Sequence, residues 1–210
     1  MTTAPEGPRR SADEALARLI EGNQRFLRGA ARTSAFRRET LADLARAQSP
    51  YATILGCSDS RVPPEWIFDT GLGELFVIRV AGNVLSPEIA GTLQYAGSYL
   101  ETPLFVVLGH EGCGAIIAAL ATKHEGEQFR SRVQLLLANI VAGLPDLDPT
   151  LSPEERASRA VESNVRWTAR QIVESPEGQA RRSEGRMKIV GAVYDIETGR
   201  VRFLPRDEPT

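Results

Sequence analysis

The stretch Pro103-Leu-Phe-Val-Val-Leu-Gly-His-Glu-Gly-Cys113 joins an apolar run to a glycine-containing turn and then to a series of small residues. A short apolar run with neighbouring valines, bounded by proline and glycine, predicts a buried strand. The small residues that follow, 113–121, predict a helix packed closely on its neighbours. Two more apolar runs, 51–56 and 74–80, predict two further buried strands.

Helical patterns alternate with these runs. The expected helices cover 12 to about 29, about 38–47, 87–100, 129–142 and 152 to about 173, and a final hairpin is expected over 188–194 and 201–204. Strands that alternate with helices indicate an α/β fold whose central sheet is mainly parallel. We expect residues 1–10 to be a flexible N-terminal tail and residues 11–210 to form a single domain.

Composition excludes several classes of protein. The chain has 210 residues, of which 42% are hydrophobic and 25% charged, as in soluble globular proteins. Its 25 Lys and Arg against 27 Asp and Glu leave no basic excess for nucleic acid or an anionic membrane surface. The longest apolar run, 115–121, is too short to span a membrane. The first ten residues, MTTAPEGPRR, lack the apolar centre of a secretory signal, so we expect a cytoplasmic protein.

Potential metal ligands follow two of the predicted strands. Cys57 comes directly after the first run, and His110 and Cys113 come directly after the third. If these strands are neighbours in a parallel sheet, the three side chains meet beyond its carboxyl edge, where α/β proteins form their sites. Two thiolates and an imidazole are ligands that suit Zn²⁺.

The number of ligands separates a structural from a catalytic metal. Structural zinc usually has four protein ligands, and the one remaining histidine, His124, lies in a polar stretch typical of the surface. Three ligands leave one position open, which is the arrangement of catalytic zinc. The alternative is that Cys57 and Cys113 are merely small buried apolar residues.

Asp59 and Arg61 follow the first cysteine at alternating positions. We expect both on the same side as Cys57, with Arg61 holding the Asp59 carboxylate beside the metal in a bidentate pair. There Asp59 can accept a hydrogen bond from metal-bound water or bind the metal itself. The alternative is an aspartate turn with a purely structural salt bridge.

These motifs together resemble the β-class carbonic anhydrases. Their zinc signature is Cys57-Ser-Asp59-Ser-Arg61 followed by His110-x-x-Cys113. The similarity extends over roughly residues 11–205 and includes Glu21-Gly-Asn-Gln-Arg-Phe26, Gly73-Glu-Leu-Phe-Val-Ile-Arg79, Ala81-Gly-Asn83 and Gly191-Ala-Val-Tyr-Asp195.

The resemblance implies a zinc lyase that interconverts CO₂ and bicarbonate, with Cys57, His110 and Cys113 as metal ligands and Asp59 and Arg61 as catalytic residues. It implies four parallel strands with one antiparallel edge strand, flanked by helices. It also implies a homodimer whose N-terminal helices pack on the partner, assembled in some members into a homotetramer.

The resemblance further assigns substrate-binding roles to Gln48, Phe76 and Tyr95: an amide that points at the substrate, and two aromatic rings of the CO₂ cleft at the dimer interface. Without the resemblance, we would expect Phe76 and Tyr95 to be residues of the hydrophobic core. One departure is Ile54, which stands where members with a regulatory bicarbonate pocket have tryptophan, although Arg79 matches another part of that pocket.

Two other functions fit the same residues. One is hydrolysis of a CO₂ analogue, carbonyl sulfide or carbon disulfide, at the same site. The other is a zinc-stabilised module without catalysis, which predicts four protein ligands. The intact Asp59–Arg61 pair and Gln48 favour an enzyme.

Overall fold

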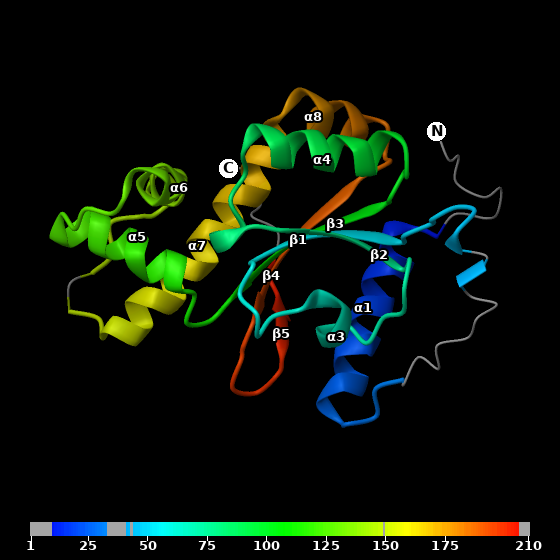
Figure 1. The fold of residues 1–210 in the computed structure, drawn as a ribbon, viewed down its shortest axis with the longest axis horizontal. Coiled ribbons are helices and arrows are strands. Elements are labelled where there is room, and N and C mark those ends of the chain that lie inside the picture. The colour runs from blue at the N-terminus through cyan, green and yellow to red at the C-terminus, as the bar shows by residue number, and fades with distance from the viewer. Residues whose placement is uncertain (1–9, 33–40, 43, 149, 206–210) are drawn as a thin grey trace.

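The computed structural model describes residues 10–32, 41–42, 44–148 and 150–205. A central sheet is covered by helices on both faces, with two further helices beyond one end of its strands (Figure 1). The expected tail, 1–10, lies outside the described residues except for its last residue. Of the helix expected at about 38–47, residues 38–40 and 43 also lie outside, whereas residues 41, 42 and 44 are helical and residues 45–46 form a turn.

Five strands and eight helices or turns of helix are described in full within these residues. The strands are β1 (Ala52–Gly56), β2 (Leu75–Arg79), β3 (Leu104–His110), β4 (Lys188–Tyr194) and β5 (Val201–Phe203). The helices are α1 (Ala12–Leu27), α3 (Pro64–Ile67), the short 3₁₀ element η1 (Ala81–Asn83), α4 (Pro87–Ser98), α5 (Gly114–Glu125), α6 (Ser131–Val141), α7 (Pro153–Glu174) and α8 (Pro176–Ser183).

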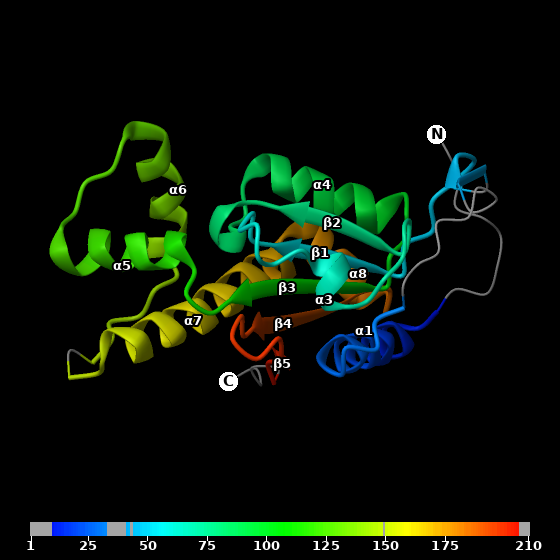
Figure 2. The same cartoon turned by 60° about the horizontal axis from the view of Figure 1, so that its bottom comes forward.

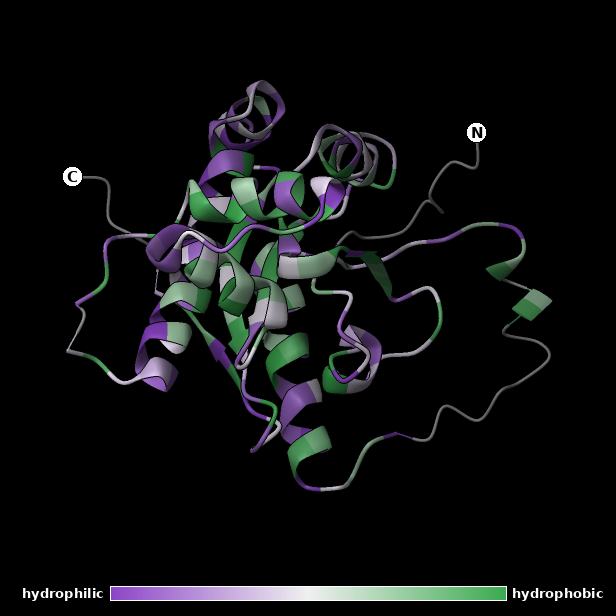
Figure 3. Ribbon diagram, turned by 60° about the vertical axis from the view of Figure 1, so that its left-hand side comes forward, coloured by the Kyte–Doolittle hydropathy of each residue, from purple (hydrophilic) through white to green (hydrophobic). Residues whose placement is uncertain are grey.

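The sheet has the strand order β2-β1-β3-β4-β5. The first four strands are parallel, and β5 pairs antiparallel with β4 at the edge, which confirms the predicted fold class. All residues of β1 and β3 are buried, as expected for central strands covered on both faces. Figure 3 shows these hydrophobic strands inside a shell of more hydrophilic helical surface.

The helices divide between the two faces of the sheet. In Figures 1 and 2, α4 and α8 cover one face together with α7, and α1 and α3 cover the other. Close approach requires glycine at Gly109, where an added Cβ would lie 2.5 Å from Val165 Cγ2 of α7. Helices α5 and α6 lie beyond the carboxyl ends of the parallel strands, so this end of the sheet is partly enclosed (Figure 2).

Asn23 fixes α1 to its own chain. This side chain is 3% exposed, and its Nδ2 donates to Ile67 O (3.2 Å) and Gly199 O (2.9 Å). Its Oδ1 accepts from Val201 N at 3.0 Å, so one amide joins α1, α3 and the β4–β5 hairpin. The buried face of α1 therefore packs against its own chain. A contact between the N-terminal helices and a partner subunit stays a prediction.

Helices α3 and α8 were not predicted from the sequence. Both are short, and α8 has a single buried residue, Gly178, so no apolar stripe reveals it. Within the described residues, no helix has both the length and the apolar character needed to cross a bilayer.

Candidate metal centre

Cys57, His110 and Cys113 form one cluster. All three are buried, and one potential ligand atom from each lies within 4.8 Å of the other two. The two sulfur atoms are 4.0 Å apart, and both cysteines are free thiols. The convergence predicted from the strand ends is therefore confirmed.

The sheet register brings the cluster together. Gly56, the last residue of β1, pairs with Leu108 of β3, so Cys57 and His110 extend from neighbouring strands at the same edge. Gly112 then turns the chain with φ 65°, a conformation that favours glycine. Cys113 is the N-cap of α5, where the backbone N–H groups of the first helical turn counteract part of the rise in its pKa that Cys57 and burial cause.

The imidazole of His110 is oriented as a metal ligand. Its Nδ1 lies 3.0 Å from the carbonyl oxygen of Glu111, which accepts its hydrogen and leaves the Nε2 lone pair free. Nε2 is buried and has no hydrogen-bond partner within the described structure. A buried, unpartnered nitrogen beside two sulfur atoms fits a zinc ion, because the ion supplies the missing partner and this donor set suits it.

The two thiols influence each other. The hydrogen bond that Cys113 donates to the Cys57 sulfur lowers the pKa of Cys57, and the same bond raises the pKa of Cys113. The backbone N–H of Gly82 also donates to the Cys57 sulfur, at 3.4 Å. Cys57 is thus held as a thiolate, the form that binds metals.

Asp59 is held by Arg61 beside this cluster. Arg61 donates to the carboxylate from its Nε (3.0 Å), from its terminal nitrogen (2.8 Å) and from its backbone N–H (2.9 Å). These hydrogen bonds keep the pKa of Asp59 well below its usual range. The carboxylate Oδ2 lies 4.0 Å from His110 Nε2, so Asp59 reaches the cluster without being part of it.

Asp59 and Arg61 are paired as expected, but strand alternation is not the cause of the pairing. Residues 60–61 form a turn rather than an extended strand, and Val62 N donates to Asp59 O at 3.2 Å. The backbone bond from Arg61 to the Asp59 side chain is an Asx turn, a local preference of aspartate. Turn chemistry, and not strand alternation, brings the two side chains together.

Arg79 supports the same loop. Its Nε donates to Cys57 O at 2.9 Å, and its terminal nitrogen donates to Asp59 O. The family resemblance relates Arg79 to a regulatory pocket and does not predict these contacts. A signal for these hydrogen bonds was present in the sequence. Arg79 ends a strand that neighbours the one followed by the potential ligand Cys57.

The expected substrate residues lie apart from the cluster within one protomer. Gln48 precedes the amino end of β1, whereas Cys57 follows its carboxyl end, and the five residues of β1 alone span about 16 Å. Phe76 pairs with Thr53 in the amino half of the sheet. The ring of Tyr95 lies 6.2 Å from that of Phe76 and is 42% exposed. Tyr95 is thus exposed at the surface, whereas Phe76 beside it is partly buried and packs against the hydrophobic core.

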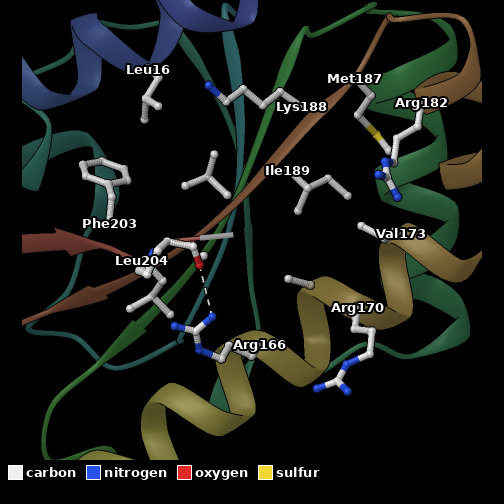
Figure 4. A pocket seen from close by; sticks show the side chains of 14 residues that line it. Leu16, Arg166, Arg170, Val173, Arg182, Met187, Lys188, Ile189, Phe203 and Leu204 are labelled. Atoms are coloured by element: carbon white, nitrogen blue, oxygen red, sulfur yellow. Dashed lines mark hydrogen bonds between the residues drawn. The ribbon is translucent and has the colours of Figure 1, made fainter. Parts of the chain in front are cut away.

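No further ligand joins the cluster among the described residues. His124 is exposed in the last turn of α5, as predicted. A separate groove of about 470 Å³ lies along residues 188–191, the amino half of β4, between α7 and Phe203 (Figure 4). The cluster adjoins the other end of this strand, where His110 pairs with Tyr194, so the groove is not part of the metal centre.

Two thiols and an imidazole that could hold a metal ion lie at the carboxyl edge of a parallel sheet, with an arginine-held carboxylate beside them, an arrangement typical of an α/β metalloenzyme. The family model described as "Carbonic anhydrase" matches residues 52–201. The chain belongs to the carbonic anhydrase family, and its similarity to solved β-carbonic anhydrases places it in the β class.

Similar proteins support this membership along most of the chain. "Carbonic anhydrase 2" of Mycobacterium tuberculosis is 38% identical over 87% of both chains. "Carbonic anhydrase" of Mycolicibacterium smegmatis is 36% identical over 88% of this chain and 89% of the relative. The crystal structure of the β-carbonic anhydrase CafA of Aspergillus fumigatus is 28% identical, with a TM-score of 0.72 over 94% of this chain and 92% of that one.

Proposed function

We propose that this protein is a zinc enzyme that catalyses the reversible hydration of CO₂ to bicarbonate and a proton. The observation that carries the proposal is the buried Cys57–His110–Cys113 cluster, whose unpartnered His110 Nε2 faces two sulfur atoms. Three protein ligands leave a coordination position for the reaction, because the described residues offer no fourth.

Each residue of the site has a distinct role in this proposal. Cys57, His110 and Cys113 hold zinc, which supplies Lewis acidity and an activated nucleophile at neutral pH. Asp59 accepts a hydrogen bond from the attacking water and so fixes the direction of its lone pair. Arg61 keeps Asp59 ionised and oriented through the two side-chain hydrogen bonds it donates.

We also propose that the active unit is a homodimer. Gln48, Phe76 and Tyr95 are too far along the sheet to serve the metal of their own chain, so their roles require the site of a partner. The exposed Tyr95 and Tyr99 rings, 5.3 Å apart, continue outward from Phe76. A homotetramer belongs to the same proposal, since a structural neighbour from Sordaria macrospora is described as tetrameric.

The proposal also covers the domain organisation of the chain and the cellular compartment of the protein. Residues 11–210 act as a single domain, and the five strands of one sheet support this. The location is cytoplasmic, a reducing compartment, and the two buried free thiols support it.

Metal analysis combined with CO₂ hydration kinetics tests the proposal. We expect about one zinc per chain and rapid hydration that chelation abolishes and added zinc restores. Turnover of carbonyl sulfide, measured on the same preparation, distinguishes CO₂ hydration from hydrolysis of a CO₂ analogue. A zinc-loaded protein that turns over neither substrate would instead be a non-catalytic zinc-stabilised module.

A further inference from the structure

The turn η1 directs a backbone N–H group at the metal cluster. Gly82 N lies 3.4 Å from the Cys57 sulfur, and both residues are buried. The donor is a peptide group, so its direction depends entirely on the conformation of the turn.

Gly82 gives this turn an unusual backbone. Its φ of 66° and ψ of 18° resemble the third residue of a type II turn, and Asn83 N closes the turn on Val80 O at 3.0 Å. If φ of Gly82 became negative, the preceding peptide would rotate and its N–H would leave the sulfur. A Cβ at this position would lie 2.7 Å from Ile140 Cδ1, so a larger residue would have to adopt the positive φ and also displace the end of that side chain.

Asn164 of α7 holds the turn from the other side. It is 1% exposed, and its Nδ2 donates to Gly82 O at 2.8 Å. Its Oδ1 has no hydrogen-bond partner among the described residues. Burying an amide on the apolar stripe of a helix costs free energy unless the amide is hydrogen-bonded. Among the described residues, the Asn164 side chain makes one hydrogen bond, the one to Gly82 O.

We infer that Asn164 is a positioning residue: by holding the carbonyl of the Gly82–Asn83 peptide it fixes the φ and ψ of Gly82, and so keeps the N–H of the adjoining Ala81–Gly82 peptide on the Cys57 thiolate. The inference rests on the proposed metal centre and concerns a residue whose side chain touches none of the three ligands. The hydrogen bond withdraws charge from the sulfur and restrains its position, so the ion is held longer and the thiolate is a weaker electron donor. Outer-shell partners of this kind typically change metal affinity or activity 10–100-fold.

Asn164→Leu tests the inference, because leucine has a similar size and no donor. The control is Thr168→Val, one turn further along α7 and also 1% exposed. Apo protein is loaded with Co²⁺ alone, and two quantities are measured: the sulfur-to-cobalt charge-transfer absorption and the rate of Co²⁺ loss to a chelator. We expect Asn164→Leu to move the absorption to longer wavelength and to accelerate loss about tenfold, with Thr168→Val unchanged.

Asn164→Ala is measured in the same way, in case the leucine variant fails to fold by circular dichroism. An unchanged absorption band and loss rate in the folded Asn164 variant would overturn the inference while leaving the metal centre intact. If wild-type protein shows no sulfur-to-cobalt absorption, the metal centre and the inference both fail.

Discussion

Replacing Arg61 with methionine should separate the contribution of the Asp59–Arg61 pair to activity from its contribution to stability. The change removes both side-chain hydrogen bonds to the Asp59 carboxylate and keeps the backbone N–H bond of the Asx turn. Asp59 therefore stays near the cluster but is free to rotate and to approach the metal.

The exposure of the pair sets the magnitude of each effect. The Arg61 side chain is 55% exposed and that of Asp59 21%, so solvent screens the pair. For one exposed ion pair in a chain of this size, its loss should lower Tm by no more than about 4 °C. The CO₂ hydration rate should fall about 10–100-fold, because Asp59 loses its fixed orientation beside the metal.

Stopped-flow CO₂ hydration, zinc content and thermal unfolding are measured on the same samples. Arg202→Met is the matched control, because Arg202 is 52% exposed and also forms a 2.9 Å ion pair, with Glu162, away from the cluster. We expect the control to keep the wild-type rate. A wild-type rate in Arg61→Met, or loss of its zinc, would refute the assigned role.

Three other changes give separate outcomes. Cys57→Ala or Cys113→Ala should release zinc and abolish CO₂ hydration, since two ligands remain; a full zinc complement by metal analysis would contradict the assignment. Asn23→Leu leaves three buried backbone groups unpartnered and should lower the free energy of unfolding by about 3–5 kcal/mol in denaturant titration, while zinc content stays unchanged. The Thr198 hydroxyl and nearby backbone N–H groups lower the pKa of Asp195, so its stabilisation is complete above the unfolded pKa of about 3.9 and is lost as pH falls further. The stability difference between wild type and Asp195→Asn should therefore disappear in acid, and a difference independent of pH would contradict this.

Much of the fold could be predicted because strong local signals agree with its long-range pairing. The buried strands were recognised from apolar runs, and the ligands from their positions at strand ends. The sequence Ser-Pro-Glu begins α4 at Ser86, α7 at Ser152 and α8 at Ser175, and each serine oxygen accepts a backbone N–H three residues later. The same capping signal was available for α8, which was missed because periodicity alone was considered there.

The contacts that organise the site could not be predicted in this way. The hydrogen bonds from Arg79 to the Cys57 loop, and from Asn164 to Gly82, join elements far apart in the chain. They depend on sheet register and helix position, which one sequence does not encode in any local pattern. The Asp59–Arg61 pair was predicted correctly, but the turn that forms it was not.

The separation of Gln48 from Cys57 along β1 has a consequence for mixtures of subunits. In the proposed dimer, each catalytic pocket takes its metal from one chain and its Gln48 from the other. A chain lacking Gln48 and a chain lacking Cys57 would each be inactive alone. Joined in one heterodimer, they would leave one pocket with an intact metal and an intact amide, and its twin with neither. Two defective proteins, unfolded and refolded together, would then regain activity that neither has by itself.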